Sequence, residues 1–387
     1  MTHPLIIIGT GLAGYMTAKE WRKIDKTTPL ILFTEDSGHF YTKPMLSNAY
    51  RMGKNTDQLI TATADEMADQ LNADIKTHCT VTAIDPINQH IVTQHDEYCY
   101  NQVVLACGAN PRHLTISGNA TDRVFSVNNY DQYRQFRKHL DKSKHITIMG
   151  TGLVGCEFAN DLRHHGYDVT MVSPDNHLLQ RFLPQPIAHH IQTALEDFGV
   201  TCHLNATISK LSYENDERIN VQTSQDDLIF HTDIVLSATG LIPNTTLAKN
   251  AGITCQRSIL VNEFLETSIN NIYALGDCVS YNHQTKMYVA PILHAARSLG
   301  KTLANDKTPL SLPALPIKVK TSVCPLAFLL PNKPNHTNWH YELNQANEGI
   351  ALCFDDNEHL QGFILWGKAT SQQVKWLKLI DTTIPAS

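Results

Sequence analysis

The stretch LIIIGTGLAG, residues 5–14, places four apolar residues directly before three glycines in the pattern G-x-G-x-x-G. The apolar run is short and rich in β-branched residues, which favours a buried strand. The first glycine then permits a tight turn, the second lets the backbone approach a pyrophosphate, and the third lets helix and strand pack closely. The helix expected next, to about Lys23, offers free N–H groups to phosphates. The stretch therefore predicts a dinucleotide-binding strand–turn–helix unit with the candidate residues Gly9, Thr10, Gly11, Leu12, Ala13 and Gly14.

A second copy of this unit lies in the middle of the chain. The stretch ITIMGTGLVG, residues 146–155, repeats the pattern, and a further strand is expected after each copy, at 30–33 and at 169–172. Each unit also reaches a hydrophobic strand that ends in small residues, at 103–111 and at 234–244. Such an internal repeat indicates a duplicated supersecondary unit. It predicts a second dinucleotide site at Gly150, Gly152, Leu153, Val154 and Gly155.

Composition narrows the class of protein. The 387 residues are 42% hydrophobic and 18% charged, which predicts two or three folded domains rather than a disordered chain. The net charge of −6 argues against a nucleic-acid binder, which would carry a basic excess. The nine cysteines are widely spaced, and no Cys-x-x-Cys occurs. We therefore expect no disulfide scaffold, no zinc or iron–sulfur site and no paired redox thiols, and we assign no metal ligands.

The start of the sequence and its hydropathy bear on location. Residues 1–4 contain no basic region, and the apolar run that follows is too short for a secretory signal. No stretch approaches the roughly 18 apolar residues that a membrane span needs. The expectation is a soluble cytoplasmic protein with free thiols and no membrane insertion.

Residues at the ends of the second strands indicate which nucleotides bind. Thr34 and Glu35 follow the strand at 30–33, where a carboxylate can accept the ribose hydroxyls of an adenosine. The corresponding strand of the second unit ends in Ser173-Pro174-Asp175, with no arginine cluster to bind a 2′-phosphate. The second unit is therefore predicted to prefer NADH to NADPH.

Four further segments carry a family resemblance. The run TSINNIYALGDC at 267–278 resembles the second FAD motif of the FAD-dependent pyridine nucleotide-disulfide oxidoreductase superfamily. The segment YTKPMLS at 41–47 is similar to one in ferredoxin and rubredoxin reductases. Glu157, after the second glycine motif, and IKVKT at 317–321 match two other family segments. Nearly end to end, the chain resembles the rubredoxin–NAD reductases of the alkane-oxidation type.

The resemblance implies an α/β fold with two Rossmann-like dinucleotide-binding domains and a small C-terminal α+β domain. The FAD-binding domain is expected to be discontinuous, and the three domains are assigned to 1–112 with 245–319 (FAD), 113–244 (NAD) and 320–387 (C-terminal). The tail's own pattern agrees with this, because 339–343, 350–354 and 360–365 are short strand-like runs typical of an antiparallel cap.

The resemblance also implies roles for single residues. Asp277 is expected to bond the ribityl chain of FAD, and Lys43 and Glu157 are expected to form an ion pair beside the flavin, with Lys320 near its polar edge. These last three are the catalytic candidates. A helix is expected to open at Pro291, with its N-terminus toward the flavin. Beyond the first glycine motif, the implied FAD-binding residues are Thr34, Glu35, Lys43, Val81, Glu157, Asp277, Val289 and Lys320.

The missing cysteines shape the predicted reaction. No cysteine lies in residues 36–78, where relatives of this fold carry redox thiols, so FAD is expected to be the sole redox centre. The prediction is electron transfer from NADH through FAD to rubredoxin, feeding an alkane hydroxylase. Two alternatives stay open: a reductase of a 2Fe–2S ferredoxin, and a flavin-loaded NAD-binding module with slow turnover. An acidic partner would need a local basic patch, for which the candidates are Arg51, Lys54, Lys286 and Lys320.

Overall fold

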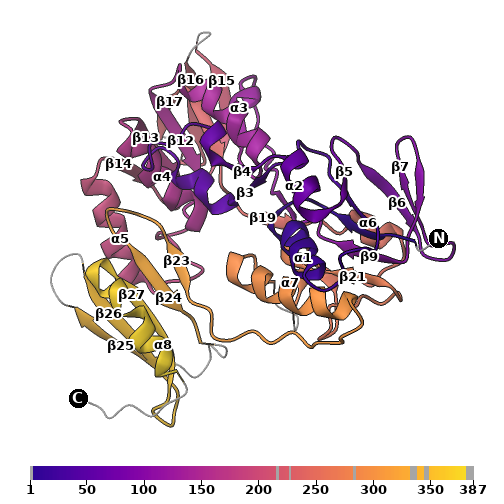
Figure 1. Cartoon of the computed structure of the whole chain (residues 1–387). Helices are drawn as coiled ribbons and strands as arrows, with labels where there is room; N and C mark the ends of the chain where they lie inside the picture. The colour runs from indigo at the N-terminus through magenta and orange to yellow at the C-terminus, as the bar shows by residue number, and fades with distance from the viewer. Residues whose placement is uncertain are drawn as a thin grey trace.

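The computed structural model describes residues 3–214, 218–225, 228–281, 285–331, 338–343 and 348–380. The predicted C-terminal range 320–387 thus ends in residues 381–387, which lie outside the described residues. Figure 1 shows two α/β units side by side and a smaller antiparallel unit, drawn in orange and yellow, beside the second of them. The α/β fold class implied by the resemblance is confirmed.

The first parallel sheet is built around the strand that precedes the first glycine motif. That strand pairs in parallel with strands on both sides, and its four residues are buried because helices cover the sheet. The helix after the motif, α1 (Leu12–Arg22), packs against α7 (Val289–Leu303). In sheet order the strands are β21 (Ile272–Ala274), β9 (Gln102–Leu105), β1 (Leu5–Ile8), β2 (Leu30–Phe33) and β5 (Asp74–Lys76).

The second parallel sheet repeats this arrangement around the second motif. Its order is β11 (Val124–Ser126), β18 (Ile234–Ser237), β12 (His145–Met149), β13 (Asp168–Val172) and β14 (Val200–His203). Each strand therefore has a counterpart in the first sheet, and α4 (Leu153–His164) takes the place of α1. The other helices of this unit are α3 (Tyr130–Leu140) and α5 (Gln185–Asp197).

Each unit also carries a three-stranded antiparallel sheet that sequence reasoning did not anticipate. In the first unit it consists of β6 (Val81–Asp85), β7 (His90–Thr93) and β8 (Glu97–Cys99). In the second it consists of β15 (Ile208–Tyr213), β16 (Ile219–Thr223) and β17 (Ile229–Thr232). The duplication therefore extends beyond the parallel sheets. Two shorter helices, α2 (Ala64–Leu71) and α6 (Thr246–Asn250), pack in the first unit.

The C-terminal unit is a five-stranded antiparallel sheet, as the tail pattern predicted. Its order is β23 (Ile317–Val319), β24 (Leu326–Leu329), β27 (Leu360–Trp366), β26 (Gly349–Phe354) and β25 (Asn338–Leu343), followed in the chain by α8 (Gln373–Lys378). One face packs into the same hydrophobic cluster as the core of the second unit, and the other packs with α8.

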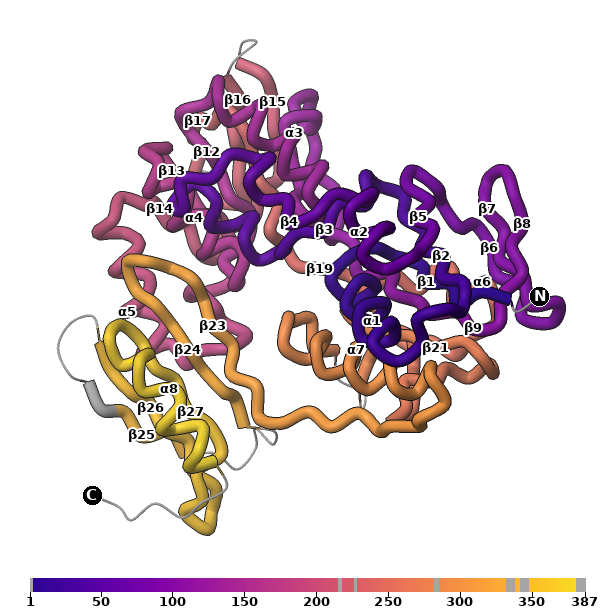
Figure 2. Tube along the Cα trace, viewed as in Figure 1, coloured from indigo at the N-terminus to yellow at the C-terminus, as the bar shows by residue number. Residues whose placement is uncertain are grey.

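Two features tie the first unit to the second. The chain crosses between them twice, and the crossing strands β10 (Ala109–Pro111) and β19 (Leu241–Pro243) pair with each other in antiparallel fashion. In addition, the 3-10 helix η1 (Lys43–Asn48) packs against α4, and Leu46 enters the core of the second unit. Figure 2 shows this indigo segment reaching across to α4. The predicted FAD-binding range 1–112 thus contains a segment that packs with the other unit, and the domain boundaries stay a prediction.

Candidate functional site

The glycines of both motifs divide into two kinds by their surroundings. A Cβ on Gly9 (φ +114°) would collide with the backbone oxygen of Ala106, and one on Gly14 would collide with that of Gly9. Gly150 (φ +107°) and Gly155 are enclosed in the same way. By contrast, a Cβ on either middle glycine, Gly11 or Gly152, would meet no protein atom within 4 Å. The outer glycines are therefore required by packing, whereas the middle ones face open space.

The helices that follow leave their N-termini free for a ligand. Gly11 and Gly152 are the N-cap residues of α1 and α4, so no side chain caps either helix, and neither has an acidic residue in its first turn. The N–H groups of an uncapped helix start carry partial positive charge and bind anions. Each cradle therefore fits a pyrophosphate. Thr10 lies in the turn before α1, and Leu12, Ala13, Leu153 and Val154 are the first residues of α1 and α4, so they stay binding candidates at these helix starts.

The ribose-binding candidates lie where the second strands end. Thr34 is buried and donates a hydrogen bond to Asp36 Oδ1 at 2.7 Å, whereas Glu35 is exposed. In the second unit Asp175 Oδ2 accepts hydrogen bonds from Thr151 Oγ1 at 3.3 Å and Ser173 Oγ at 3.1 Å. A carboxylate thus follows each strand beside its glycine motif.

Asp277 supplies the strongest sign of a missing partner. It lies in the 3-10 helix η4 (Gly276–Cys278), and its Oδ1 atom is enclosed without any hydrogen-bond partner. The neighbouring Gly276 (φ +85°) lies so near Ala13 that a Cβ would come within 2.9 Å of it. Burial raises the pKa of the Asp277 carboxyl, opposed by the charge of Lys43. An enclosed acceptor beside the first glycine motif fits a hydroxyl of the ribityl chain of FAD.

Lys43 does not form the ion pair that the resemblance implied. Its Nζ donates a hydrogen bond to Asn128 Oδ1 at 2.6 Å, and Asn128 in turn donates to the Ala109 carbonyl at 2.8 Å. Burial lowers the pKa of Lys43, while the charge of Asp277 opposes the shift. The predicted Lys43–Glu157 ion pair is therefore wrong for this structure, since the lysine lies against Asn128 and interacts with Asp277 instead.

Glu157 joins three parts of the chain. Its Oε2 accepts a hydrogen bond from Ser47 Oγ at 2.6 Å, and its Oε1 accepts one from the backbone N–H of Lys320 at 2.9 Å. The residue is buried, and burial raises the pKa of its carboxyl against the effect of those donors. The Lys320 ammonium points elsewhere and donates to the Pro44 carbonyl at 3.1 Å. Lys320 is exposed. Desolvation is the largest cause that lowers the pKa of its ammonium group, and the nearby charge of Arg51 lowers that pKa further.

Several residues at this junction were not chosen from the sequence. Ser47 lies within the quoted 41–47 segment, and Asn160 and Asp161 lie three and four residues after Glu157 on α4, so the sequence around them was noted but their roles were not. Asn128 belongs to no motif, and no local signal could have found it.

The remaining candidates are placed as follows. Val81 begins β6 and is half-buried, and Val289 begins α7. The helix expected to open at Pro291 therefore starts two residues earlier, because the first helical N–H groups need no intrahelical partner and proline is tolerated there. All nine cysteines are free. Burial raises the pKa of Cys107 well above its usual value and that of Cys278 to about 12, which disfavours their thiolates.

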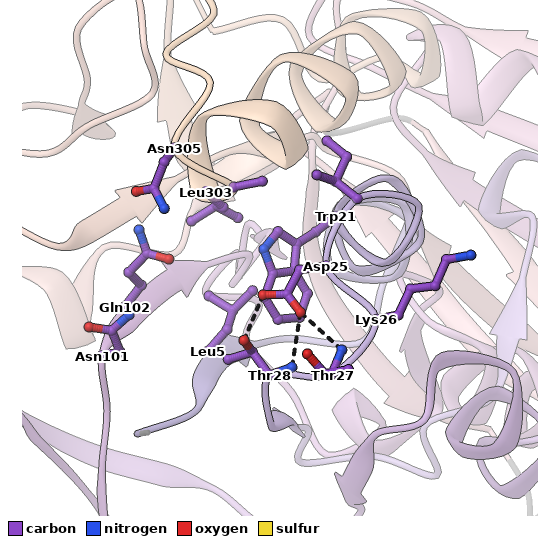
Figure 3. A pocket seen from close by; sticks show the side chains of 12 residues that line it. Leu5, Trp21, Asp25, Lys26, Thr27, Thr28, Asn101, Gln102, Leu303 and Asn305 are labelled. Atoms are coloured by element: carbon purple, nitrogen blue, oxygen red, sulfur yellow. Dashed lines mark hydrogen bonds between the residues drawn. The ribbon is translucent and has the colours of Figure 1, made fainter. Parts of the chain in front are cut away.

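Other features lie away from the glycine motifs. A cavity of about 600 Å³, drawn in Figure 3, is lined by Trp21, Gln102 and Leu303 among others. It lies where β1 and β9 begin, the sheet edge opposite the first glycine motif. Within the described ranges, no cluster of three or more His, Cys, Asp or Glu side chains could hold a metal ion. No helix among those residues has the length and apolarity to cross a membrane.

Comparison with known proteins agrees with this geometry. Residues 3–298 match the family Pyridine nucleotide-disulphide oxidoreductase, and residues 309–380 match the family Rubredoxin binding C-terminal domain. The chain is 40% identical over 392 residues to Rubredoxin-NAD(+) reductase of Acinetobacter baylyi, covering 99% of each chain. It is 38% identical over 383 residues to the protein of the same name from Alcanivorax borkumensis, covering 99% of this chain and all of that one.

A solved structure extends the comparison to the fold. A ferredoxin reductase from Rhodopseudomonas palustris superimposes with a TM-score of 0.88 at 21% identity, over 99% of this chain and 96% of that one. At this identity the likeness concerns the fold alone. On the sequence matches, the chain belongs to the pyridine nucleotide-disulphide oxidoreductase family and, within it, to the rubredoxin-NAD(+) reductases.

Proposed function

We propose that this protein oxidises NADH and passes the electrons through FAD to rubredoxin. The observation that carries the choice of acceptor is the match of residues 309–380 to the family Rubredoxin binding C-terminal domain. The two relatives named Rubredoxin-NAD(+) reductase, each matched over its whole length, support the same acceptor and the same donor.

The residues would divide the two nucleotides between the two units. The first glycine motif, with Thr34, Glu35 and Asp277, would hold FAD, and the second, with Gly152 as its open position, would hold NADH. When bound, FAD lets a two-electron donor serve one-electron acceptors. The protein itself would bind and orient the two nucleotides without carrying electrons, because its cysteines are free and the thiols nearest the site have raised pKa values.

Three side chains would then set the surroundings of the flavin. Lys43 brings a positive charge held by Asn128, which would favour negative charge on the reduced cofactor. Glu157 would hold the backbone of Lys320 and the hydroxyl of Ser47 beside the flavin site. These assignments rest on contacts within the protein, and Val81 and Val289 stay FAD-binding candidates from the resemblance alone.

The encounter with an acidic iron–tetracysteine protein needs local positive charge, since the chain carries −6 overall. Of the four predicted cations, Arg51 and Lys320 are exposed and interact electrostatically, whereas Lys54 and Lys286 are half-buried. We infer that the first two contribute most to steering. We also propose a cytoplasmic location, consistent with nine free cysteines, and an alkane hydroxylase as the final user of the electrons.

The test starts with the purified protein loaded with FAD. Anaerobic NADH should abolish the visible absorbance of the flavin. If it does not, the slow-turnover alternative replaces both enzyme readings. Cytochrome c reduction that depends on added rubredoxin, and that 2Fe–2S ferredoxin does not support, would then confirm the acceptor. Equal reduction with ferredoxin would contradict it.

A further inference from the structure

Helix α4 carries three buried polar side chains on one face. Glu157, Asn160 and Asp161 are spaced i, i+3 and i+4, so they project from the same side, and their exposed fractions are 8%, 0% and 1%. Buried carboxylates and amides are costly unless they are hydrogen-bonded. Their partners therefore indicate why this face of the helix is polar.

Asp161 binds the first unit. Its Oδ2 accepts a hydrogen bond from the backbone N–H of Tyr50 at 3.1 Å, and its Oδ1 accepts one from the backbone N–H of Arg51 at 2.8 Å. Both amides lie just after η1, the segment that carries Lys43 and Ser47. Hydrogen bonds to a charged acceptor are stronger than neutral ones, and two successive amides fix the direction of the backbone. The carboxylate thus fastens this segment to α4.

Asn160 binds the C-terminal unit. Its Oδ1 accepts hydrogen bonds from the Ser322 N–H at 3.0 Å, the Ser322 hydroxyl at 3.1 Å and the Val323 N–H at 3.3 Å. Its own Nδ2 is buried and has no partner. The side chain therefore serves here as an acceptor, although its unpaired buried donor is unfavourable. These amides directly follow Lys320 and Thr321 in the chain.

We propose that Asp161 and Asn160 are positioning residues for electron transfer, which set the placement of the NADH-binding unit relative to the flavin site. The proposal rests on the proposed function. The first turn of α4 belongs to the second glycine motif, while the segments it fastens carry Lys43 and Lys320, the residues predicted beside FAD. The paired strands β10 and β19 alone would allow the two units to rotate about the crossing. The polar face of α4, together with Leu46 in the core of the second unit, restricts that rotation.

The same contacts hold two like charges together. Arg51 is held through its backbone N–H to Asp161, and Lys320 through its backbone N–H to Glu157, so α4 positions the backbones that carry the two exposed cations. Without a bound acidic partner, the two positive charges repel each other, and this repulsion contributes to lowering the pKa of Lys320. Loss of the Asp161 contact would let Arg51 move away.

The test uses the FAD-loaded protein and the variants Asp161→Ala, Asp161→Asn and Asn160→Ala, with His164→Ala as the matched control. His164 is exposed at the end of the same helix, and its ring contacts Phe198 rather than the 48–52 or 320–324 segments. Hydrogen exchange is followed in peptides covering 48–52 and 320–324, and flavin bleaching by anaerobic NADH is measured per bound FAD. Asparagine keeps one acceptor but loses the charge, so D161N should fall between the wild type and D161A.

We expect D161A to lose exchange protection at 48–52 and N160A to lose it at 320–324, each without affecting the other segment. A displacement of about 1 Å between reacting groups costs up to roughly 100-fold in rate, so bleaching in D161A should slow by at least about tenfold. FAD content and the Kd for NADH should stay near wild type, because neither glycine motif is altered. A merely structural role would lower the unfolding temperature without changing the rate per bound flavin.

Two results would overturn the inference. Unchanged exchange at 48–52 in D161A would show that the contact does not hold the segment. Lost protection with an unchanged bleaching rate would show that it does not position the cofactors. If D161A does not fold, D161N decides by the same two measurements. A wild-type protein that NADH does not bleach would instead refute the proposed function, and the exchange data would still report on the contact.

Discussion

Replacing the middle glycine of each motif by alanine separates binding from folding. Gly11 has φ −67° and ψ −174°, extended angles that alanine adopts readily, and a Cβ there would meet no protein atom within 4 Å. Alanine is a poorer N-cap than glycine but restricts the unfolded chain. These effects are each roughly 0.5–1 kcal/mol and opposite in sign, so the free energy of unfolding of the apoprotein should change by less than about 1 kcal/mol.

The matched control is Gly9→Ala. Gly9 has φ +114°, and its added Cβ would collide with the Ala106 carbonyl. Backbone strain of about 1–3 kcal/mol and overpacking of similar size should destabilise the fold by about 2–6 kcal/mol. Gly9→Ala should therefore fail by unfolding, whereas Gly11→Ala should fold and lose flavin.

Flavin content after purification and FAD titration of the apoprotein provide the assay, with thermal unfolding measured in parallel. A methyl group placed against the pyrophosphate should cost about 1–3 kcal/mol, or roughly 10–100-fold in the Kd for FAD. Gly152→Ala should keep its FAD and lose NADH affinity by a similar factor. Full flavin in Gly11→Ala together with flavin loss in Gly152→Ala would refute the division of nucleotides between the two units.

Three further predictions concern single side chains near the flavin site. Asp277→Ala should weaken FAD binding in titrations, because its enclosed Oδ1 has no partner within the protein and fits a hydroxyl of the cofactor; an unchanged FAD affinity would contradict this. Burial lowers the pKa of Lys43 below its ordinary 10.5, so the ammonium group loses its charge before the pH reaches 10.5. As the pH rises, the NADH oxidation rate should therefore begin to fall below pH 10.5. In Lys43→Arg, which stays charged, this fall should disappear, and an unchanged pH profile would exclude Lys43 as its source. The double variant Cys107→Ala/Cys278→Ala should bleach with NADH within about twofold of wild type in stopped-flow measurements, since neither thiol carries electrons; a complete loss in folded, FAD-loaded protein would reveal a thiol relay.

The sequence predicted those parts of the fold that local patterns determine. A buried strand before G-x-G-x-x-G constrains its own turn and helix, and finding the pattern twice was enough to predict the two parallel sheets. An antiparallel unit was likewise predicted from the strand-like runs of the tail. The two three-stranded sheets were not, since short alternating strands give a weak signal beside the glycine motifs.

The site was harder to predict, because its contacts join distant positions. The partner of Lys43 is Asn128, 85 residues away, and the partners of Glu157 come from positions 47 and 320. A motif shows that such residues belong together but not which of them touch. The resemblance implied a Lys43–Glu157 ion pair, whereas Lys43 donates to the amide of Asn128 and Glu157 accepts from the hydroxyl of Ser47.

The paired crossing strands β10 and β19 also make the second unit an insertion with adjacent ends. Pro111 lies opposite Leu241, and all five strands of the first sheet come from outside the residues between them. A two-residue turn replacing 112–240 would therefore leave that sheet intact in its strand order. The excision would expose the η1 segment, whose Leu46 is packed in the removed core, and also the face of the C-terminal unit that packs against that core. The molecule is thus modular in its chain path but not in its packing, so exchanging the second unit for that of a relative requires exchanging η1 with it.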